Sequence, residues 1–298
     1  MIRLSYVVIA DEWSVVADLA AALDAQTAES EIELVVVAGR PIEPPPCRVT
    51  VRVVSASTHT RAGAREVGLR AVSGDVVALG ETHVFPAPGW ARAVLDAHDA
   101  GADVVLPYVT NANPGSPLSW AAFLMDYGRY STRTGSATPV PTYNASVRRD
   151  VLLALPDPSA ALEPGLRLDT DLRARGARVV QASGAELAHL NVDRTLDWMR
   201  ERVLAGVLLG RSRRQSLGLA RRVAYAAALP LIACLLAVRA LRIPRRGGPS
   251  GSGAAVVLGC GLYAVGEAIG YVGPLGRGRA ERRMLRYEMY KRDYATGE

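Results

Sequence analysis

The stretch GDVVALGETHVFPAPGW, residues 74–90, decides how the chain is predicted to fold. Its run Val76–Leu79 is apolar and rich in β-branched residues, which is typical of a buried parallel strand. Glu81 and His83 follow directly, and the prolines after them exclude a helix just downstream. Residues two apart on extended chain project to the same side. The carboxylate and the imidazole are therefore predicted to point the same way from a strand end.

The rest of the first 200 residues alternates between strand and helix signals. Continuous apolar runs predict strands at 4–10, 32–39, 48–56, 102–109 and around 178–182. Helical spacing predicts helices at 14–26, 61–74, 89–101 and 168–175, and a further helix beginning at or near Asn144. This alternation predicts an α/β fold with a mostly parallel central sheet.

Three side chains near strand ends are candidate metal ligands. Glu81 and His83 can share a divalent cation such as Mn²⁺ or Mg²⁺. The alternative is a surface glutamate with a histidine packed under Trp90. His189 also follows a predicted strand, and ligands of open α/β sheets bind at the carboxyl ends of strands. A structural role is the alternative for His189.

Polar residues around 144–171 are candidates for catalysis and acceptor binding. Asp169 and Asp171 precede or begin a short helix, where one could act as a general base facing the sheet crevice. Alternatively, one caps the helix and the other suits its dipole. Asn144 could be only an N-cap, and Arg148 with Arg149 could be a solvated pair or could meet phosphate or acceptor charge.

Several function classes lose their sequence support. The chain has no GxGxxG, Walker or GxSxG loop, so the main signals for dinucleotide binding, P-loop hydrolysis and serine hydrolysis are missing. Three widely spaced cysteines, Cys47, Cys234 and Cys260, give neither a disulfide framework nor a CxxC metal site. The first residues do not read as a signal peptide, because their apolar run is short and acidic residues follow. The body is therefore expected to stay in the cytoplasm.

The C-terminal third differs in charge and hydropathy from the rest. Of the net charge of +6, residues 201–298 contribute 17 Lys or Arg against 6 Asp or Glu, whereas residues 1–200 are mildly acidic. Two apolar helices are predicted at about 223–241 and 254–274, with arginines before, between and after them. A membrane hairpin, two interfacial helices and two buried helices of a soluble domain all fit. Nucleic-acid binding is disfavoured because the arginines lack a stacking surface.

Ordered landmarks resemble the family 2 inverting glycosyltransferases of the GT-A fold. The segments that carry the resemblance are AREVGLRAVSGDVVAL (64–79), ETHVFPAPGW (81–90), YNASVRRDVL (143–152), LDTDLRARGARVV (168–180), AELAHLN (185–191) and GEAIGYVG (266–273). The resemblance implies a GT-A domain at 1–210 and a basic, membrane-associating helical region at 211–298. The chain departs from the family pattern in four places. Glu81 and His83 replace the usual aspartates, and Leu168 replaces a glutamate. Ala38–Arg40 lacks an acidic residue, and Glu66 stands where asparagine is common.

The resemblance also implies an activity and a role for each candidate residue. A sugar would move with inversion from a nucleotide-diphosphate donor to a lipid-linked or envelope-glycan acceptor, assisted by Mn²⁺ or Mg²⁺. The implied site is Asp169 as base with Asp171 beside it; Ala10, Asp11, Arg65, Asp75 and Glu81 toward the donor; Asn144, Arg148 and Trp90 toward the acceptor; and Glu81, His83 and His189 on the metal.

Two further expectations follow from the resemblance. The catalytic domain is expected on the cytoplasmic side of the cell membrane, with no nucleic-acid partner. The alternative function is a degenerate, non-catalytic GT-A protein that serves as a membrane-bound scaffold or binding subunit. The missing acid at Ala38–Arg40 and the leucine at Leu168 favour this alternative.

Overall fold

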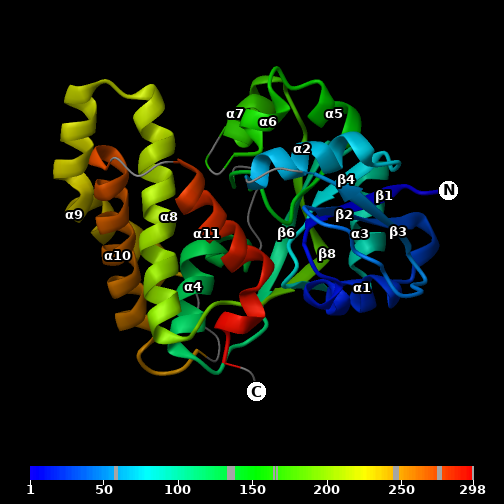
Figure 1. Ribbon diagram of the computed structural model, residues 1–298, viewed down its shortest axis with the longest axis horizontal. Coiled ribbons are helices and arrows are strands. Elements are labelled where there is room, and N and C mark those ends of the chain that lie inside the picture. Colours follow the sequence, from blue (N-terminus) through cyan, green and yellow to red (C-terminus); the bar gives the residue numbers. More distant parts are fainter. Residues whose placement is uncertain are drawn as a thin grey trace. The chain divides into compact units, whose positions relative to one another are not determined.

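The chain divides by its contacts into two compact units in a computed structural model (Figure 1). The structure describes residues 1–56, 60–132, 138–163, 165, 167–243, 248–273 and 277–296. The first unit comprises Met1–Thr110 and Tyr130–Ala188, and the second comprises Asn111–Arg129 and His189–Glu298.

An eight-stranded sheet runs in the order β3-β2-β1-β4-β7-β6-β8-β5. The strands are β1 (Leu4–Ile9), β2 (Ile32–Ala38), β3 (Thr50–Ser55), β4 (Val76–Leu79), β5 (Val84–Pro86), β6 (Val104–Asn111), β7 (Ser146–Arg148) and β8 (Val179–His189). β1 pairs in parallel with β2 and β4, and β2 pairs in parallel with β3. β7 is antiparallel to both β4 and β6. The prediction of an α/β fold is confirmed, and the sheet is mixed, because β7 is antiparallel to both of its neighbours.

Helices of the first unit accompany this sheet. They are α1 (Ala17–Asp24), α2 (Arg61–Ala71), α3 (Trp90–Asp99), α5 (Arg149–Leu153), α6 (Pro158–Ala161) and α7 (Arg167–Ala174). Short 3-10 turns are η1 (Trp13–Val15), η2 (Glu29–Glu31) and η3 (Gly128–Tyr130), the last of which spans the boundary between the units.

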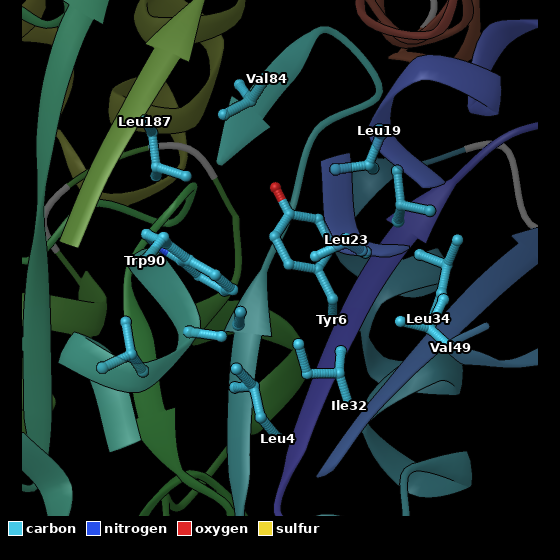
Figure 2. Close-up of a cluster of buried hydrophobic side chains, with 14 of the residues drawn as sticks. Leu4, Tyr6, Leu19, Leu23, Ile32, Leu34, Val49, Val84, Trp90 and Leu187 are labelled. Atoms are coloured by element: carbon cyan, nitrogen blue, oxygen red, sulfur yellow. The ribbon is translucent and has the colours of Figure 1, made fainter. Parts of the chain in front are cut away.

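The central strands are buried on both faces. Alternate side chains of β1 enter different cores: Leu4 and Tyr6 join one cluster, and Val7 joins the other. Figure 2 shows the first cluster, in which the rings of Tyr6 and Trp90 form a T-shaped pair with centroids 5.6 Å apart. Two-sided burial explains why these strands are continuous apolar runs rather than alternating ones.

The prediction of a helix beginning at or near Asn144 is wrong. Asn144 has a left-handed φ of 57° and is followed by β7, and helix α5 begins only at Arg149. β7 fills the gap between β4 and β6 in the sheet. These ladder hydrogen bonds come from strands far away in sequence, so tertiary pairing overrides the local helical preference.

His98, on α3, is a buried neutral histidine that predicts acid sensitivity. Its Nδ1 donates to the Ala102 carbonyl at 2.8 Å, so its Nε2 accepts from the Ser146 hydroxyl at 3.0 Å. Burial lowers its pKa, and the Arg148 charge lowers it further. The unfolded chain therefore binds this proton first, and stability falls as pH drops below about 6.5.

We expect the variant His98→Gln to lose less stability on acidification than the wild type. Loss of this titrating group should reduce the pH slope of the unfolding free energy by up to about 1.4 kcal/mol per pH unit. Urea unfolding at pH 7 and pH 5 measures the slope. Equal slopes in the two proteins would contradict this assignment.

The second unit is a helical bundle. Its helices are α4 (Pro117–Asp126), α8 (Thr195–Ser216), α9 (Leu219–Leu241), α10 (Ser252–Val272) and α11 (Arg277–Met289), followed by the 3-10 turn η4 (Lys291–Tyr294). α10 packs against α8, α9 and α4. The two apolar helices expected at about 223–241 and 254–274 correspond to α9 and α10. Both are long and apolar enough to cross a membrane by length and composition.

Candidate active site

Glu81, His83 and Asn144 meet at the carboxyl end of β4. Glu81 is only 6% exposed and His83 only 1%. Asn144 Nδ2 donates to Glu81 Oε2 at 2.6 Å, and His83 Nε2 lies 4.0 Å from the same oxygen. The Asn144 backbone amide also bonds the Leu79 carbonyl. The interpretation of Glu81 as a surface residue is therefore wrong, and its carboxylate is held by a side chain 63 residues away.

Arg65, on α2, bonds the two backbone segments that carry Glu81 and Asn144. It is 1% exposed and donates to the Gly80 carbonyl at 3.4 Å and to the Thr142 carbonyl. The Tyr6 ring lies under Gly80, where an added Cβ would come within 2.0 Å of a ring carbon. Burial raises the pKa of Tyr6, and the Glu81 charge adds to the effect. The arrangement fixes the strand end beneath Glu81.

Ala10 and Asp11 leave the sheet at the same edge. β1 lies beside β4 and parallel to it, so their carboxyl ends share one side of the sheet. The Ala10 amide donates to the Val37 carbonyl at 3.1 Å, and the Asp11 carbonyl accepts from Arg40 Nε at 2.6 Å. The structure thus brings Ala10 and Asp11 to the edge that carries Glu81.

Arg40 also forms an ion pair with Glu12 at this edge. No motif in the sequence had singled out this pair. The only sequence feature that points to it is Arg40, which follows β2 where the glycosyltransferase family pattern has an acidic residue.

Asp169 and Asp171 lie on α7 and take different partners. Asp169 Oδ1 accepts from the Val140 backbone amide at 2.9 Å and from Arg173 Nε at 2.7 Å. Arg173 in turn donates to the Thr138 carbonyl at 2.8 Å. Asp171 faces Arg167, with Nε to Oδ2 at 3.4 Å. Asp169 therefore ties α7 to the segment that leads to Asn144.

Three other predicted site residues lie elsewhere in the first unit. Asp75 is exposed and precedes β4, so it lies at the strand's amino end, opposite Glu81. Arg148 is opposite Val76 in the sheet register and pairs with Asp150 at 3.1 Å, also at that far end. Trp90 is 2% exposed and belongs to the core cluster. The structure does not gather these three with Glu81.

His189 is the last residue of β8 and is counted with the second unit. It is 1% exposed, and its ring lies 4.0 Å from the Tyr127 ring by centroids. Its Nδ1 lies 2.9 Å from Asn191 Oδ1, while Asn191 Nδ2 donates to Asn111 Oδ1 at 2.9 Å. The Asn191 amide is thereby oriented, so His189 donates from Nδ1 and keeps its lone pair on Nε2.

The electrostatic surroundings keep the His189 imidazole neutral. Burial lowers its pKa to about 3, with the Lys291 charge contributing, against opposing effects of Glu288 and Asp126. A neutral imidazole whose other nitrogen donates to a fixed oxygen is the form in which histidine binds metals. Sequence motifs had missed Asn191, whose one signal was an asparagine two residues after a candidate ligand.

Comparison with known proteins gives structural likeness alone. No family model matches the chain, and no curated protein matches it. The mannosyltransferase PcManGT from Pyrobaculum calidifontis, solved with GDP-Man and Mn²⁺, has a TM-score of 0.50 and 16% identity, over 96% of this chain and 85% of that one.

Two further solved structures are similar at lower scores. S. aureus TarS 1–349 in complex with UDP has a TM-score of 0.44 and 14% identity, over 90% of this chain and 91% of that one. In the longer S. aureus TarS structure, the match covers only 55% of that protein. Glucosyl-3-phosphoglycerate synthase from Mycobacterium tuberculosis has a TM-score of 0.43 and 17% identity, over 71% of this chain and 77% of that one. The sheet order and the likeness to PcManGT show that this chain has a mixed α/β fold of the GT-A type, followed by C-terminal helices.

Proposed function

We propose that the chain is a glycosyltransferase that moves a sugar from a nucleotide-diphosphate donor to a membrane-associated acceptor, with inversion. The observation that carries the proposal is the buried Glu81 carboxylate. It lies at the carboxyl edge of a GT-A-type sheet, between Asn144 and His83. A buried carboxylate held at a strand end is a candidate for binding a cation or ligand rather than for stabilising the core.

Glu81, His83 and His189 are a buried group of ligand-type side chains that could hold a divalent cation. The 4.0 Å between Glu81 Oε2 and His83 Nε2 is within the span of two metal bonds of about 2.1 Å each. His83 precedes β5, and β5 lies beside β8, the strand that His189 ends. The cation would offset the charge of the diphosphate leaving group. PcManGT was solved with Mn²⁺, which supports the same class of ion here.

The remaining roles follow from which residues lie near Glu81. Ala10 and Asp11 share its sheet edge and are proposed to face the donor. Asn144 orients Glu81 and is proposed to border the acceptor. Asp169 is proposed as the base that takes the proton of the acceptor hydroxyl, with Arg173 holding the carboxylate in place.

Calorimetry on the purified full chain tests the proposal. Titration with UDP and with GDP, each with and without Mn²⁺, should show binding of at least one nucleotide that strengthens with the metal. A donor screen that measures nucleoside diphosphate release then tests turnover. Absence of any metal-dependent nucleotide binding would overturn the proposal.

The second candidate function is a non-catalytic membrane scaffold. One observation favours it: Leu168, where the family pattern has a glutamate, is fully buried in the second core cluster. That position therefore contributes packing rather than chemistry. Nucleotide binding without sugar transfer to any acceptor would support this alternative.

The acceptor and the location are part of the same proposal. The two apolar helices and the excess of arginine in residues 201–298 support a lipid-linked or envelope-glycan acceptor at a membrane. The catalytic unit is proposed to face the cytoplasm.

A further inference from the structure

Helices α8 and α10 are interlocked through glycines in the second unit. A Cβ added at Gly206 of α8 would lie 2.0 Å from the Tyr263 carbonyl oxygen of α10. One added at Gly266 of α10 would lie 2.0 Å from the Val203 carbonyl oxygen of α8. No side chain fits at either distance, so the two backbones touch directly. This close approach depends on glycine.

The contact continues along both helices in the same direction. Near the start, an added Cβ at Gly259 would lie 3.0 Å from the Trp198 ring. Near the end, Arg214 Nη1 donates to the Gly273 carbonyl at 3.1 Å. Contacting positions therefore advance together along α8 and α10. The two helices are parallel and lie side by side along this length.

α8 is too polar to accompany α10 across a bilayer. Its longest uncharged run is 203–210, which spans about 12 Å of helix, whereas the hydrocarbon core is about 30 Å thick. α10 itself carries Glu267, which is 1% exposed and pairs with Arg213 of α8 at 2.5 Å. Tyr271 adds a hydrogen bond to Glu267 at 2.7 Å. A spanning α10 would have to break these contacts.

α9 carries an exposed apolar face. Four large apolar side chains, eight, four and three residues apart, are open to solvent: Val223 (61%), Leu231 (64%), Leu235 (50%) and Val238 (44%). The opposite side of α9 is packed, with Leu229, Ala237 and Ala240 buried. No charged residue lies between Arg222 and Arg239. Exposed arginines at both ends of the helix, Arg221 and Arg239, suit lipid phosphates.

We propose that the exposed face of α9 docks into one leaflet of an anionic lipid bilayer, as an anchor that does not cross the membrane. α10 stays packed on α8 and supports α9 from behind. The apolar row enters the acyl boundary, and the terminal arginines meet phosphate headgroups. This inference does not depend on sugar transfer, so either can fail without the other.

Vesicle sedimentation with matched leucine variants tests the docking face. Leu231 on α9 is 64% exposed and Leu196 on α8 is 65% exposed, so lysine at either position leaves the core intact. With phosphatidylcholine vesicles containing phosphatidylglycerol, we expect Leu231→Lys to reduce binding at least tenfold and Leu196→Lys to bind like wild type. Vesicles without phosphatidylglycerol should bind the wild type more weakly. Equal binding by both variants, or none by wild type, would overturn the proposal.

Cysteine labelling in sealed membrane vesicles separates docking from spanning. Ser30 of the first unit and Ser250, between α9 and α10, are both exposed and accept cysteine. In a background with Cys47→Ser and Cys234→Ala, Cys260 stays buried. We expect an impermeant maleimide to label Ser30→Cys and Ser250→Cys from the same side. Labelling from opposite sides would show that α9 crosses the membrane and would overturn the proposal.

The exposed face of α9 could instead bind a second copy of the chain, and this outcome is tested separately. Sedimentation equilibrium without lipid measures the mass of the wild type and of Leu231→Lys. A wild-type dimer that dissociates in Leu231→Lys, together with no vesicle binding, would assign the face to a second copy and overturn the lipid assignment. A monomer that binds vesicles supports it.

Discussion

Replacing Glu81 by alanine is expected to lower metal-dependent sugar transfer by about 10²-fold or more. Removal of one preorganised group that stabilises developing charge, such as an oxyanion-hole donor, costs about 10²–10³ in rate. Glu81 is 6% exposed and is held by Asn144 at 2.6 Å, so its carboxylate is fixed in position at the strand end. The same change should also weaken Mn²⁺-dependent nucleotide binding by calorimetry.

Two comparison variants make the result specific. Glu81→Gln keeps the shape of the side chain and an oxygen for Asn144 but removes the charge, so it should resemble Glu81→Ala. Asp169→Asn should retain metal-dependent nucleotide binding and lose turnover, because its proposed role is proton removal. Far-UV circular dichroism checks that each variant folds. Wild-type turnover in Glu81→Ala would exclude Glu81 from the site.

Replacing Arg202 by alanine is expected to destabilise the second unit by about 3–5 kcal/mol. Its guanidinium, on α8, makes two hydrogen bonds to Asp126 of α4, at 2.9 and 2.7 Å, and two to Glu201, at 3.2 and 2.7 Å. Burial alone would lower the pKa of Arg202, but Asp126 and Glu201 raise it well above its usual value. Alanine leaves both carboxylates without this cation in a site where Glu201 is 4% exposed.

Arg200 provides the matched control for Arg202. It lies on the same helix, its side chain is 66% exposed, and it pairs with Asp197 at 3.5 Å. Arg200→Ala should change stability by only about 0–1 kcal/mol, as exposed ion pairs contribute little. Urea unfolding monitored by circular dichroism compares the two. A loss for Arg202→Ala no larger than that for Arg200→Ala would show that the buried cluster does not stabilise this unit.

Most strands of the first unit could be predicted from the sequence, because each is marked by an apolar run within a few residues. The runs that form β1, β2 and β4 are apolar on both sides, which predicts buried parallel strands without knowledge of their partners. The helix predicted at Asn144 failed for the opposite reason. β7 exists because β4 and β6 pair with it, and neither is close in sequence.

The candidate site divides in the same way. Glu81 and His83 could be found from their spacing after a strand, because a two-residue period on extended chain fixes a common direction. The residues that hold Glu81 and the backbone around it could not be predicted from the sequence. Asn144 reaches Glu81 across 63 residues, and Arg65 reaches the Thr142 carbonyl across 77. Trp90, predicted at the acceptor, is instead packed against Tyr6.

The sequence by itself determined the α/β class, the strand end that carries Glu81 and His83, and the presence of two long apolar helices. Each follows from periodicity and hydropathy within one short window. Only the tertiary structure decided that Asn191 orients the His189 imidazole and that α10 is interlocked with α8 while α9 remains exposed. Burial and hydrogen bonding depend on which distant segments meet. A short sequence window shows which side chains are apolar enough to be buried. Tertiary packing decides which of them are buried.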